Sequence, residues 1–280
     1  MLSYQHEYHA GNHADVLKHA VLVLCLESLL RKDKPLRVYD AHAGSGIYDL
    51  RGAEARKTAE ADSGIVRLCA AAGPPPALDG YLGAVRACNR GSDVLRRYPG
   101  SPALIRHLLR PADHLVLLER HPRALALLRH NFTLDPQVHL HARDCHEGLP
   151  GLLPPPERRG LVLLDPSYEM RGEFGHTAGL LQDCHRRFAG GVYLLWYPLL
   201  RQAPAARLVR RVAASGMRPV LRAELRVEDA SHAGLHGSGV LVVNPPYGLD
   251  VTLRTLVPWL WRTLAPEGRG GWAAEWLVPE

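Results

Sequence analysis

The sequence predicts an α/β fold, a Rossmann-like domain with a seven-stranded, mostly parallel sheet. Two observations support this prediction. Short apolar runs that end in polar residues alternate with segments of helical periodicity, as in a sheet covered by helices on both faces. The first run, residues 36–40, leads into a turn of small residues at 41–46 (Ala-His-Ala-Gly-Ser-Gly), which is how Rossmann-type domains begin.

Length and composition limit the class of protein. A chain of 280 residues can form one large α/β domain or a domain with an insert. Its longest apolar run, residues 20–26, is too short to cross a membrane, and its N-terminus lacks the features of a signal peptide. Five cysteines without CxxC spacing indicate reduced thiols. We therefore expect a cytoplasmic protein with no membrane segment, and we expect it to be a monomer.

The charge indicates a class of partner. The net charge is +6 and the pI about 9.2, which suits a polyanion such as nucleic acid. The arginine pairs are spread along the chain and form no basic tail, so a folded basic face is expected rather than a disordered arm.

One segment interrupts the expected alternation of strands and helices. A helix at 14–30 precedes the first strand, but no second strand follows after a single helix. Residues 47–98 are instead rich in Ala, Arg and Gly, with a Gly-Pro-Pro-Pro break at 73–76. We interpret 47–98 as an inserted helical subdomain, so that 1–46 and 99–280 form the main domain.

The remaining elements alternate regularly. Ser101 is well placed to cap the N-terminus of a helix that runs to about residue 110, with Pro102 at its first position. Further strands are expected at 114–118, 138–141, 161–164, 191–196, 220–227 and 239–243, and further helices at 123–131, 203–215 and 249–264, before a short tail.

Acidic residues follow three of the expected strands. Glu119 follows the second strand, Asp144 the third and Asp165 the fourth, so all three should meet the 41–46 turn at one edge of the sheet. Gly44 and its neighbours would let the backbone approach a cofactor closely. A carboxylate after the second strand can hold ribose hydroxyls, and a polar side chain after the third can accept from an adenine amine. Singly, each carboxylate could be a solvated loop residue. Together they resemble the pattern of class I S-adenosylmethionine methyltransferases.

Residues 165–168 (Asp-Pro-Ser-Tyr) offer the groups that amine methylation of a flat base requires. The Asp165 carboxylate and the Pro166 carbonyl can accept the amine hydrogens, and Tyr168 can stack on the ring. Residues 244–247 (Asn-Pro-Pro-Tyr) form a similar tetrad after the last strand. Position after the fourth strand favours 165–168 as the reactive turn. We interpret 244–247 as a structural turn on the same face of the domain.

The N-terminal segment, residues 4–19, is rich in histidine. A metal site is not expected, because no cysteine or carboxylate cluster completes a tetrahedral ligand set. A polar lid over the active site is favoured, with a frayed tail as the alternative. In such a lid Tyr4 could stack on a base, while Lys18 and His19 could face cofactor or phosphate. Cys145, for which no activating base is indicated, is interpreted as a pocket residue. A core role is favoured for Trp196.

Taken together, these segments resemble the RlmJ-type family of bacterial 23S ribosomal RNA adenine-N6 methyltransferases. The resemblance is carried by His-Ala-Gly-Asn-His-Ala-Asp-Val-Leu-Lys-His (9–19), Asp-Ala-His-Ala-Gly-Ser-Gly (40–46), Tyr-Pro-Gly-Ser-Pro (98–102), Asp-Pro-Ser-Tyr-Glu-Met (165–170), Leu-Trp-Tyr-Pro (195–198) and Trp-Leu-Val-Pro-Glu (276–280).

This resemblance implies roles for individual residues. S-adenosylmethionine would be bound by His19, His42, Ser101, Glu119, Asp144, Cys145 and Asp165. Asp165 would also be the catalytic residue, Tyr4 would touch the substrate base, and His6 and Lys18 occupy lid positions of the family. Segment 47–98 matches the family's helical subdomain. One departure is Ser167, where the family tetrad has a second proline; Asp165, Pro166 and Tyr168 are retained.

The predicted function is therefore N6 methylation of one adenosine in 23S ribosomal RNA, with S-adenosylmethionine as methyl donor and no metal. Two alternatives stay open: a DNA adenine-N6 methyltransferase, which uses the same tetrad, and a catalytically weak RNA-binding protein in which Ser167 marks decay. A nicotinamide dehydrogenase is disfavoured by the aromatic tetrad.

Overall fold

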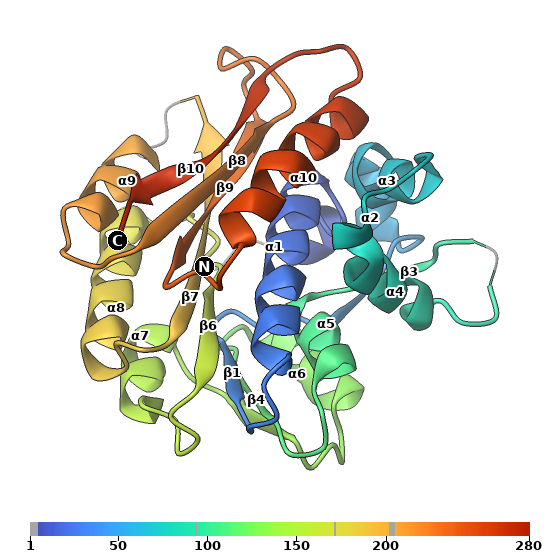
Figure 1. Cartoon of the computed structure of the whole chain (residues 1–280). Helices are drawn as coiled ribbons and strands as arrows, with labels where there is room; N and C mark the ends of the chain where they lie inside the picture. Colours follow the sequence, from blue (N-terminus) through green and yellow to red (C-terminus); the bar gives the residue numbers. More distant parts are fainter. Residues whose placement is uncertain (1–4, 93, 171, 202–204) are drawn as a thin grey trace.

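The main sheet of the computed structural model has eight strands in the order β10-β8-β9-β7-β6-β1-β4-β5 (Figure 1). The structure describes residues 5–92, 94–170, 172–201 and 205–280. Five neighbouring strands are parallel: β5 (Val138–His141), β4 (His114–Leu118), β1 (Arg37–Asp40), β6 (Gly160–Leu164) and β7 (Val192–Leu200). The other three join through antiparallel pairs: β9 (Leu235–Val243), β8 (Val220–Arg226) and β10 (Gly271–Val278). The predicted Rossmann-like α/β fold is confirmed.

Helices cover both faces of the sheet (Figure 1). One face packs against α1 (His13–Leu30), α5 (Ser101–Leu108), α6 (Pro122–Asn131) and α10 (Leu249–Leu264). The other packs against α7 (Cys145–Gly148), the 3-10 turn η4 (Leu149–Leu152), α8 (Glu173–Arg187) and α9 (Ala205–Ala213). Successive strand residues point to opposite faces, so Val38 of β1 joins the first core and Tyr39 the second.

Helix α1 is buried along most of its length. Asn12 caps its N-terminus by accepting from the amides of Ala14 and Asp15. Its side chains from Leu17 to Leu26 are largely buried, because the sheet lies on one side and α4, α5 and α10 lie on the others. A helix surrounded in this way owes most of its stability to packing against its neighbours.

The segment between β1 and α5 forms a group of short elements. They are β2 (Ile47–Asp49), α2 (Ala53–Thr58), the π-helical turn η2 (Asp62–Val66), α3 (Arg67–Ala70), the 3-10 turn η3 (Pro76–Leu78), α4 (Asp79–Cys88) and β3 (Arg97–Pro99). Strands β2 and β3, which the sequence did not predict, pair with each other, and Ile47 lies opposite Pro99. The segment therefore leaves and rejoins the main domain at one place.

Three expectations about the elements are wrong. The C-terminal tail is not an extension beyond the sheet but strand β10, which makes eight strands instead of seven. Helix α8 lies between β6 and β7, where no helix was predicted. Ser101 is not a cap: Gly100, in extended conformation, holds that position and Ser101 is the first helical residue. A Cβ at Gly100 would lie 2.9 Å from the ring of Tyr48.

The position expected for the 244–247 turn is also wrong. Strand β9 runs antiparallel to β7, and Val243 lies opposite Tyr193 near the start of β7. Residues 244–247 therefore lie at the edge of the sheet opposite to the ends of β6 and β7. There the Asn244 amide nitrogen donates to the carbonyls of Ala189 and Gly191, and Tyr247 is fully exposed.

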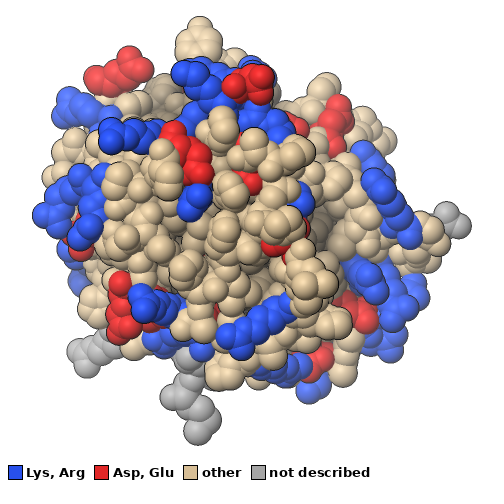
Figure 2. All heavy atoms as spheres, turned by 90° about the horizontal axis from the view of Figure 1, so that it is seen from below, with Lys and Arg blue, Asp and Glu red and all other residues tan. Residues whose placement is uncertain are grey.

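Figure 2 shows the distribution of charge on one face of the molecule. On the face shown in Figure 2, Lys and Arg lie mainly around the margin, and the centre is mostly uncharged. The excess charge is thus not gathered into a single patch on that face. None of the helices in the described part of the chain combines the length and apolar content that a membrane span requires.

Candidate active site

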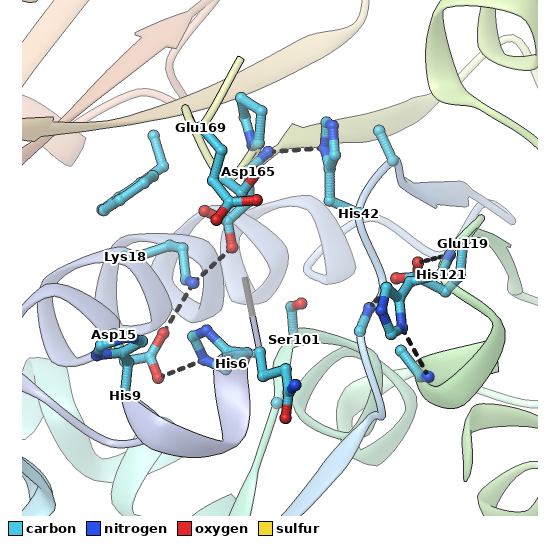
Figure 3. Close-up of a pocket in the computed structure, with 18 of the residues that line it drawn as sticks. His6, His9, Asp15, Lys18, His42, Ser101, Glu119, His121, Asp165 and Glu169 are labelled. Carbon is cyan, nitrogen blue, oxygen red and sulfur yellow. Dashed lines mark hydrogen bonds and ion pairs between the residues drawn. The ribbon is translucent and has the colours of Figure 1, made fainter. Parts of the chain in front are cut away.

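A cavity of about 600 Å³ opens at the carboxyl ends of β1, β4, β6 and β7. Its walls come from the turn after β1, the residues after β4, the start of α7 and the 165–170 segment (Figure 3). The first turn of α1 and the 3-10 turn η1 (His6–Tyr8) close another side. The structure thus brings the predicted lid and the predicted strand-end residues together around one space.

His42 connects two walls of the cavity. Its Nδ1 accepts from the backbone amide of Asp165 at 3.1 Å, so the proton of the neutral ring is on Nε2, which lies 3.3 Å from Sγ of Cys145. Burial lowers the pKa of His42 to about 4, which keeps the ring neutral. His42 therefore fixes the start of the 165–168 turn.

Glu119 holds the glycine turn. One carboxylate oxygen accepts from the Gly44 amide at 2.8 Å and the other from the His121 amide at 2.6 Å. Gly44 has a φ of +59°, and a Cβ there would come within 2.3 Å of the Tyr48 hydroxyl. Only glycine fits this turn without displacement. The predicted neighbourhood of Glu119 and the 41–46 turn is present.

Asp144 and Cys145 form the wall at the end of β5. Asp144 caps α7 by accepting from the His146 amide at 2.8 Å, and Arg120 donates to its other oxygen at 2.6 Å. Although burial opposes it, these partners lower the pKa of Asp144 below its usual range. Burial raises the pKa of Cys145 to about 12, so its thiol is protonated at neutral pH. This agrees with a pocket role for Cys145 and not with a nucleophile.

Asp165 lies in a chain of charges that begins in α1. Lys18 Nζ is 2.6 Å from Oδ2 of Asp165 and 2.8 Å from Oδ1 of Asp15 (Figure 3). His6 Nε2 is 2.9 Å from Oδ2 of Asp15. Burial would lower the pKa of Lys18, but the two carboxylates raise it overall. A buried ammonium therefore lies between two carboxylates, one of them the predicted catalytic residue.

His19 lines the cavity and is held by two tyrosines. Its Nδ1 is 2.6 Å from the hydroxyl of Tyr98, which is 2.8 Å from the hydroxyl of Tyr81 in α4. Burial holds the pKa of His19 well below its usual value. Its Nε2 is buried and has no hydrogen-bond partner among the described residues. A neutral imidazole with a free nitrogen can bind a polar ligand group in the cavity.

Ser101 and Asp40 lie beneath the same wall. Ser101 lines the cavity at the start of α5. Asp40 ends β1, and burial raises its pKa to about 7. Its Oδ1 accepts from the His42 amide at 3.2 Å, and this bond and the Ser101 side chain act against the effect of burial on its pKa.

Tyr168 does not occupy the position expected for base stacking. Its ring packs against Phe174 and Trp196, at centroid distances of 4.2 and 5.9 Å, and its hydroxyl donates to the Trp196 carbonyl at 2.7 Å. It is not among the residues that line the cavity, whereas Trp196 is. Trp196, for which the sequence favoured a core role, therefore offers an aromatic surface to this space.

Other predicted residues have mixed outcomes. Tyr4 lies outside the described residues, so its contact with a base stays a prediction. His6, Lys18, His42, Gly44, Ser101, Glu119, Asp144, Cys145, Asp165 and Pro166 all line the cavity. Sequence reasoning missed Asp15, although Asp15, Lys18 and His19 have the i, i+3 and i+4 spacing that places side chains on one helix face.

Comparisons with known proteins agree with this geometry. A family model described as "RsmJ: Ribosomal RNA large subunit methyltransferase D, RlmJ" matches residues 33–278. The chain is 41% identical to Ribosomal RNA large subunit methyltransferase J of Haemophilus influenzae and 42% identical to that of Escherichia coli K12, each over 281 residues and the full length of both chains. Among solved structures, protein LPL1258 of Legionella pneumophila has a TM-score of 0.88 and 32% identity, over 96% of this chain and 98% of that one.

Proposed function

The chain belongs to the RlmJ family of S-adenosylmethionine-dependent large-subunit ribosomal RNA methyltransferases, and we propose that it methylates N6 of one adenosine in 23S ribosomal RNA. The observation that carries this proposal is the turn after β6. There Asp165 and Pro166 line a cavity that an unstacked base can enter, so that the Asp165 carboxylate and the Pro166 carbonyl are the acceptors we propose. Taking the base out of its stack costs a few kcal/mol.

The chemistry of the amine explains why this turn is needed. The N6 lone pair of adenine is delocalised into the ring, so acceptors that hold both N6 hydrogens favour the pyramidal, nucleophilic amine. Lys18 binds Oδ2 of Asp165, and no described residue donates to Oδ1. Oδ1 can therefore accept one N6 hydrogen and the Pro166 carbonyl the other. Positioning of this kind can supply much of the rate enhancement.

The methyl donor fits the wall formed by β1, β4, β5 and α1. S-adenosylmethionine supplies a methyl group on a positively charged sulfur. Three features of the chain support its binding here: the Gly44 turn that leaves no room for a side chain, the Glu119 carboxylate beside it, and the unpartnered Nε2 of His19. The residues that we propose for the donor are His19, His42, Gly44, Ser101, Glu119, Asp144, Cys145 and Asp165.

Base recognition involves aromatic surface and the N-terminal lid. We propose that Trp196 contacts the base and that Tyr168 supports Trp196 from behind, because Trp196 lines the cavity and Tyr168 does not. Tyr4 and His6 would cover the other side.

The organisation of the protein completes the proposal. We propose that 47–98 is an inserted subdomain of the methyltransferase domain formed by 1–46 and 99–280; the pairing of β2 with β3 at its base supports this division. We further propose that the protein is cytoplasmic, because ribosomal RNA is the substrate class of the family. We also propose that it is a monomer. Light scattering of the purified protein would contradict the monomer if it gave twice the mass of 30.9 kDa.

Mapping of N6-methyladenosine by mass spectrometry tests the substrate. Protein-free 23S RNA is incubated with S-adenosylmethionine and either the wild-type protein or Asp165→Ala, with duplex DNA as a parallel acceptor. We expect one new N6-methyladenosine in 23S RNA with the wild type alone. Methylation of the DNA but not the RNA, or of another atom of the RNA, would overturn the proposal.

A further inference from the structure

Three groups converge on the carboxylate of Asp15 in the first turn of α1. Its side chain is 2% exposed. Oδ2 accepts from His6 Nε2 at 2.9 Å and from the Gly11 amide at 2.8 Å, while Oδ1 is 2.8 Å from Nζ of Lys18. One buried carboxylate therefore contacts both the N-terminal lid and the cation that binds the catalytic carboxylate (Figure 3).

Lys18 is held from two sides by this arrangement. An ammonium has three N–H donors, so Nζ can bind Asp15 and Asp165 at the same time. Burial would raise the pKa of Asp15, but the neighbouring His6 and Lys18 side chains hold it well below its usual range, so Asp15 is anionic. Without the Asp15 carboxylate, the Lys18 ammonium would be bound by Asp165 alone and would no longer be fixed in position from α1.

We infer that Asp15 is a positioning residue for methyl transfer, because it fixes Lys18 against one oxygen of Asp165 and docks His6 above the cavity. The second oxygen of Asp165 is then left facing the substrate. The lid and the catalytic carboxylate are thereby coupled: the same carboxylate that holds His6 also sets the place of Lys18. This inference rests on the proposed transfer to adenosine N6.

Asp15→Asn tests the inference, because it keeps the shape of the side chain and removes its charge. Single-turnover transfer to 23S RNA is measured with enzyme in excess and saturating S-adenosylmethionine. Since a displacement of about 1 Å can cost about 100-fold in rate, we expect transfer to slow by at least roughly tenfold. Glu119 is remote from Asp15, and Nε2 of His19 lies 4.0 Å from Oδ1 of Asp15, beyond hydrogen-bonding distance. The Kd for S-adenosylmethionine, measured by calorimetry, should therefore change by less than about twofold.

The outcomes are distinguishable. Absence of transfer by the wild type would overturn the proposed function. Normal transfer by Asp15→Asn beside an active wild type would overturn the inference alone. A parallel loss of donor affinity and of thermal stability would show that Asp15 is merely structural, and would overturn it as well.

A double-mutant cycle tests the coupling without altering Asp15. His6→Gln is measured in the wild-type and in the Lys18→Met background. If Asp15 links His6 to Lys18, the effect of His6→Gln on the single-turnover rate should be at least about threefold smaller in the Lys18→Met background than in the wild type. An equal effect in both backgrounds would overturn the inference.

Glu60→Gln is the matched control for this cycle. Glu60 also binds the N-terminal segment, accepting from His9 at 2.8 Å and from Asn12 at 2.9 Å. Lys18 is not among its partners in the described chain. The effect of Glu60→Gln on the single-turnover rate should therefore be the same in the wild-type and Lys18→Met backgrounds. Non-additivity of Glu60→Gln with Lys18→Met would show that the cycle does not isolate Asp15.

Discussion

Two turns of this molecule have similar sequences and different surroundings. Residues 165–168 (Asp-Pro-Ser-Tyr) follow β6, and residues 244–247 (Asn-Pro-Pro-Tyr) follow β9. Each contains a non-glycine residue in the left-handed region, Tyr168 at φ +56° and Asn244 at +53°. Strand β6 is parallel to its neighbours and ends at the cavity, whereas β9 is antiparallel and ends at the opposite edge.

The difference teaches that strand direction, and not the tetrad, decides which turn lies at the cavity. The first side chain of one turn, Asp165, binds Lys18 beside the cavity. The corresponding Asn244 donates to the carbonyls of Ala189 and Gly191 and so ties one loop to another. The two tyrosines differ as well, because Tyr168 packs among aromatic rings and Tyr247 is fully exposed.

The largest contrast between the turns should be in activity. A positioned acid–base residue typically contributes about 10²–10⁴-fold, so Asp165→Ala should reduce the single-turnover rate by at least about 100-fold. Asn244→Ala should leave that rate within about twofold of wild type, because the turn is remote, but should lower stability by about 0.5–1.5 kcal/mol, because it removes two hydrogen bonds that lie near the surface. Urea unfolding and a transfer assay measure both. Equal losses of activity would contradict the comparison.

The pH dependence of the free energy of unfolding should arise more from groups at the edge with the 165–168 turn than from groups at the other edge. Burial raises the pKa of Asp40 to about 7. In the unfolded chain its pKa is about 4. The stabilising contribution is therefore complete below about pH 4 and is lost as the pH rises through about 7, which amounts to roughly 2 kcal/mol between about pH 5 and 8. Asp40→Asn should flatten this part of the stability profile. Superimposable profiles of variant and wild type would show that Asp40 does not titrate in this range.

The two tyrosines should differ in their contribution to folding. Tyr168→Phe removes the donor to the Trp196 carbonyl, so the free energy of unfolding should fall by about 1–2 kcal/mol. Tyr247→Phe, on an exposed side chain, should change it by less than about 0.5 kcal/mol. Urea denaturation of both variants provides the measurement. A loss at Tyr247 as large as that at Tyr168 would indicate a contact that the structure does not contain.

The smallest effects are expected from exchanging the third residues of the turns. The Ser167 amide has no acceptor among the described residues, so Ser167→Pro should stabilise by about 0.4–1 kcal/mol through the unfolded state. Pro246→Ser should destabilise by a similar 0.4–1 kcal/mol or so. Transfer by Ser167→Pro should not be slower than wild type. A large loss would reveal a role for the Ser167 side chain.

Much of the edge that bears the cavity could be predicted because its elements are strongly patterned. The apolar run of β6 is buried on both faces, and the polar residues after β4, β5 and β6 mark where those strands end. Strand β10 could not be recognised, because it is only partly buried and its exposed positions follow no period of two. Helix α8 was missed although its buried positions, such as Thr177, Leu181 and Cys184, recur at helical spacing.

The direction of β9 and the orientation of the Tyr168 ring were both mispredicted from the sequence, for different reasons. Only eight residues separate β8 from β9, too few for a crossover helix, so the sequence did contain a signal for an antiparallel pair at that point. The orientation of Tyr168 has no such local signal. It depends on Phe174 and Trp196, which come from α8 and β7 and meet Tyr168 only in the folded chain.

The buried helix α1 has a consequence for the order in which the protein is made. Translation delivers α1 first, but β9 and α10, which pack on it, are delivered last. Until residues 235–264 have emerged from the ribosome, the side of α1 that β9 and α10 cover in the folded protein lacks these partners, and its apolar side chains are exposed to aggregation. The enzyme should therefore acquire its fold after synthesis of the last third of the chain, and nascent chains that stop before β9 should depend on chaperones for their solubility.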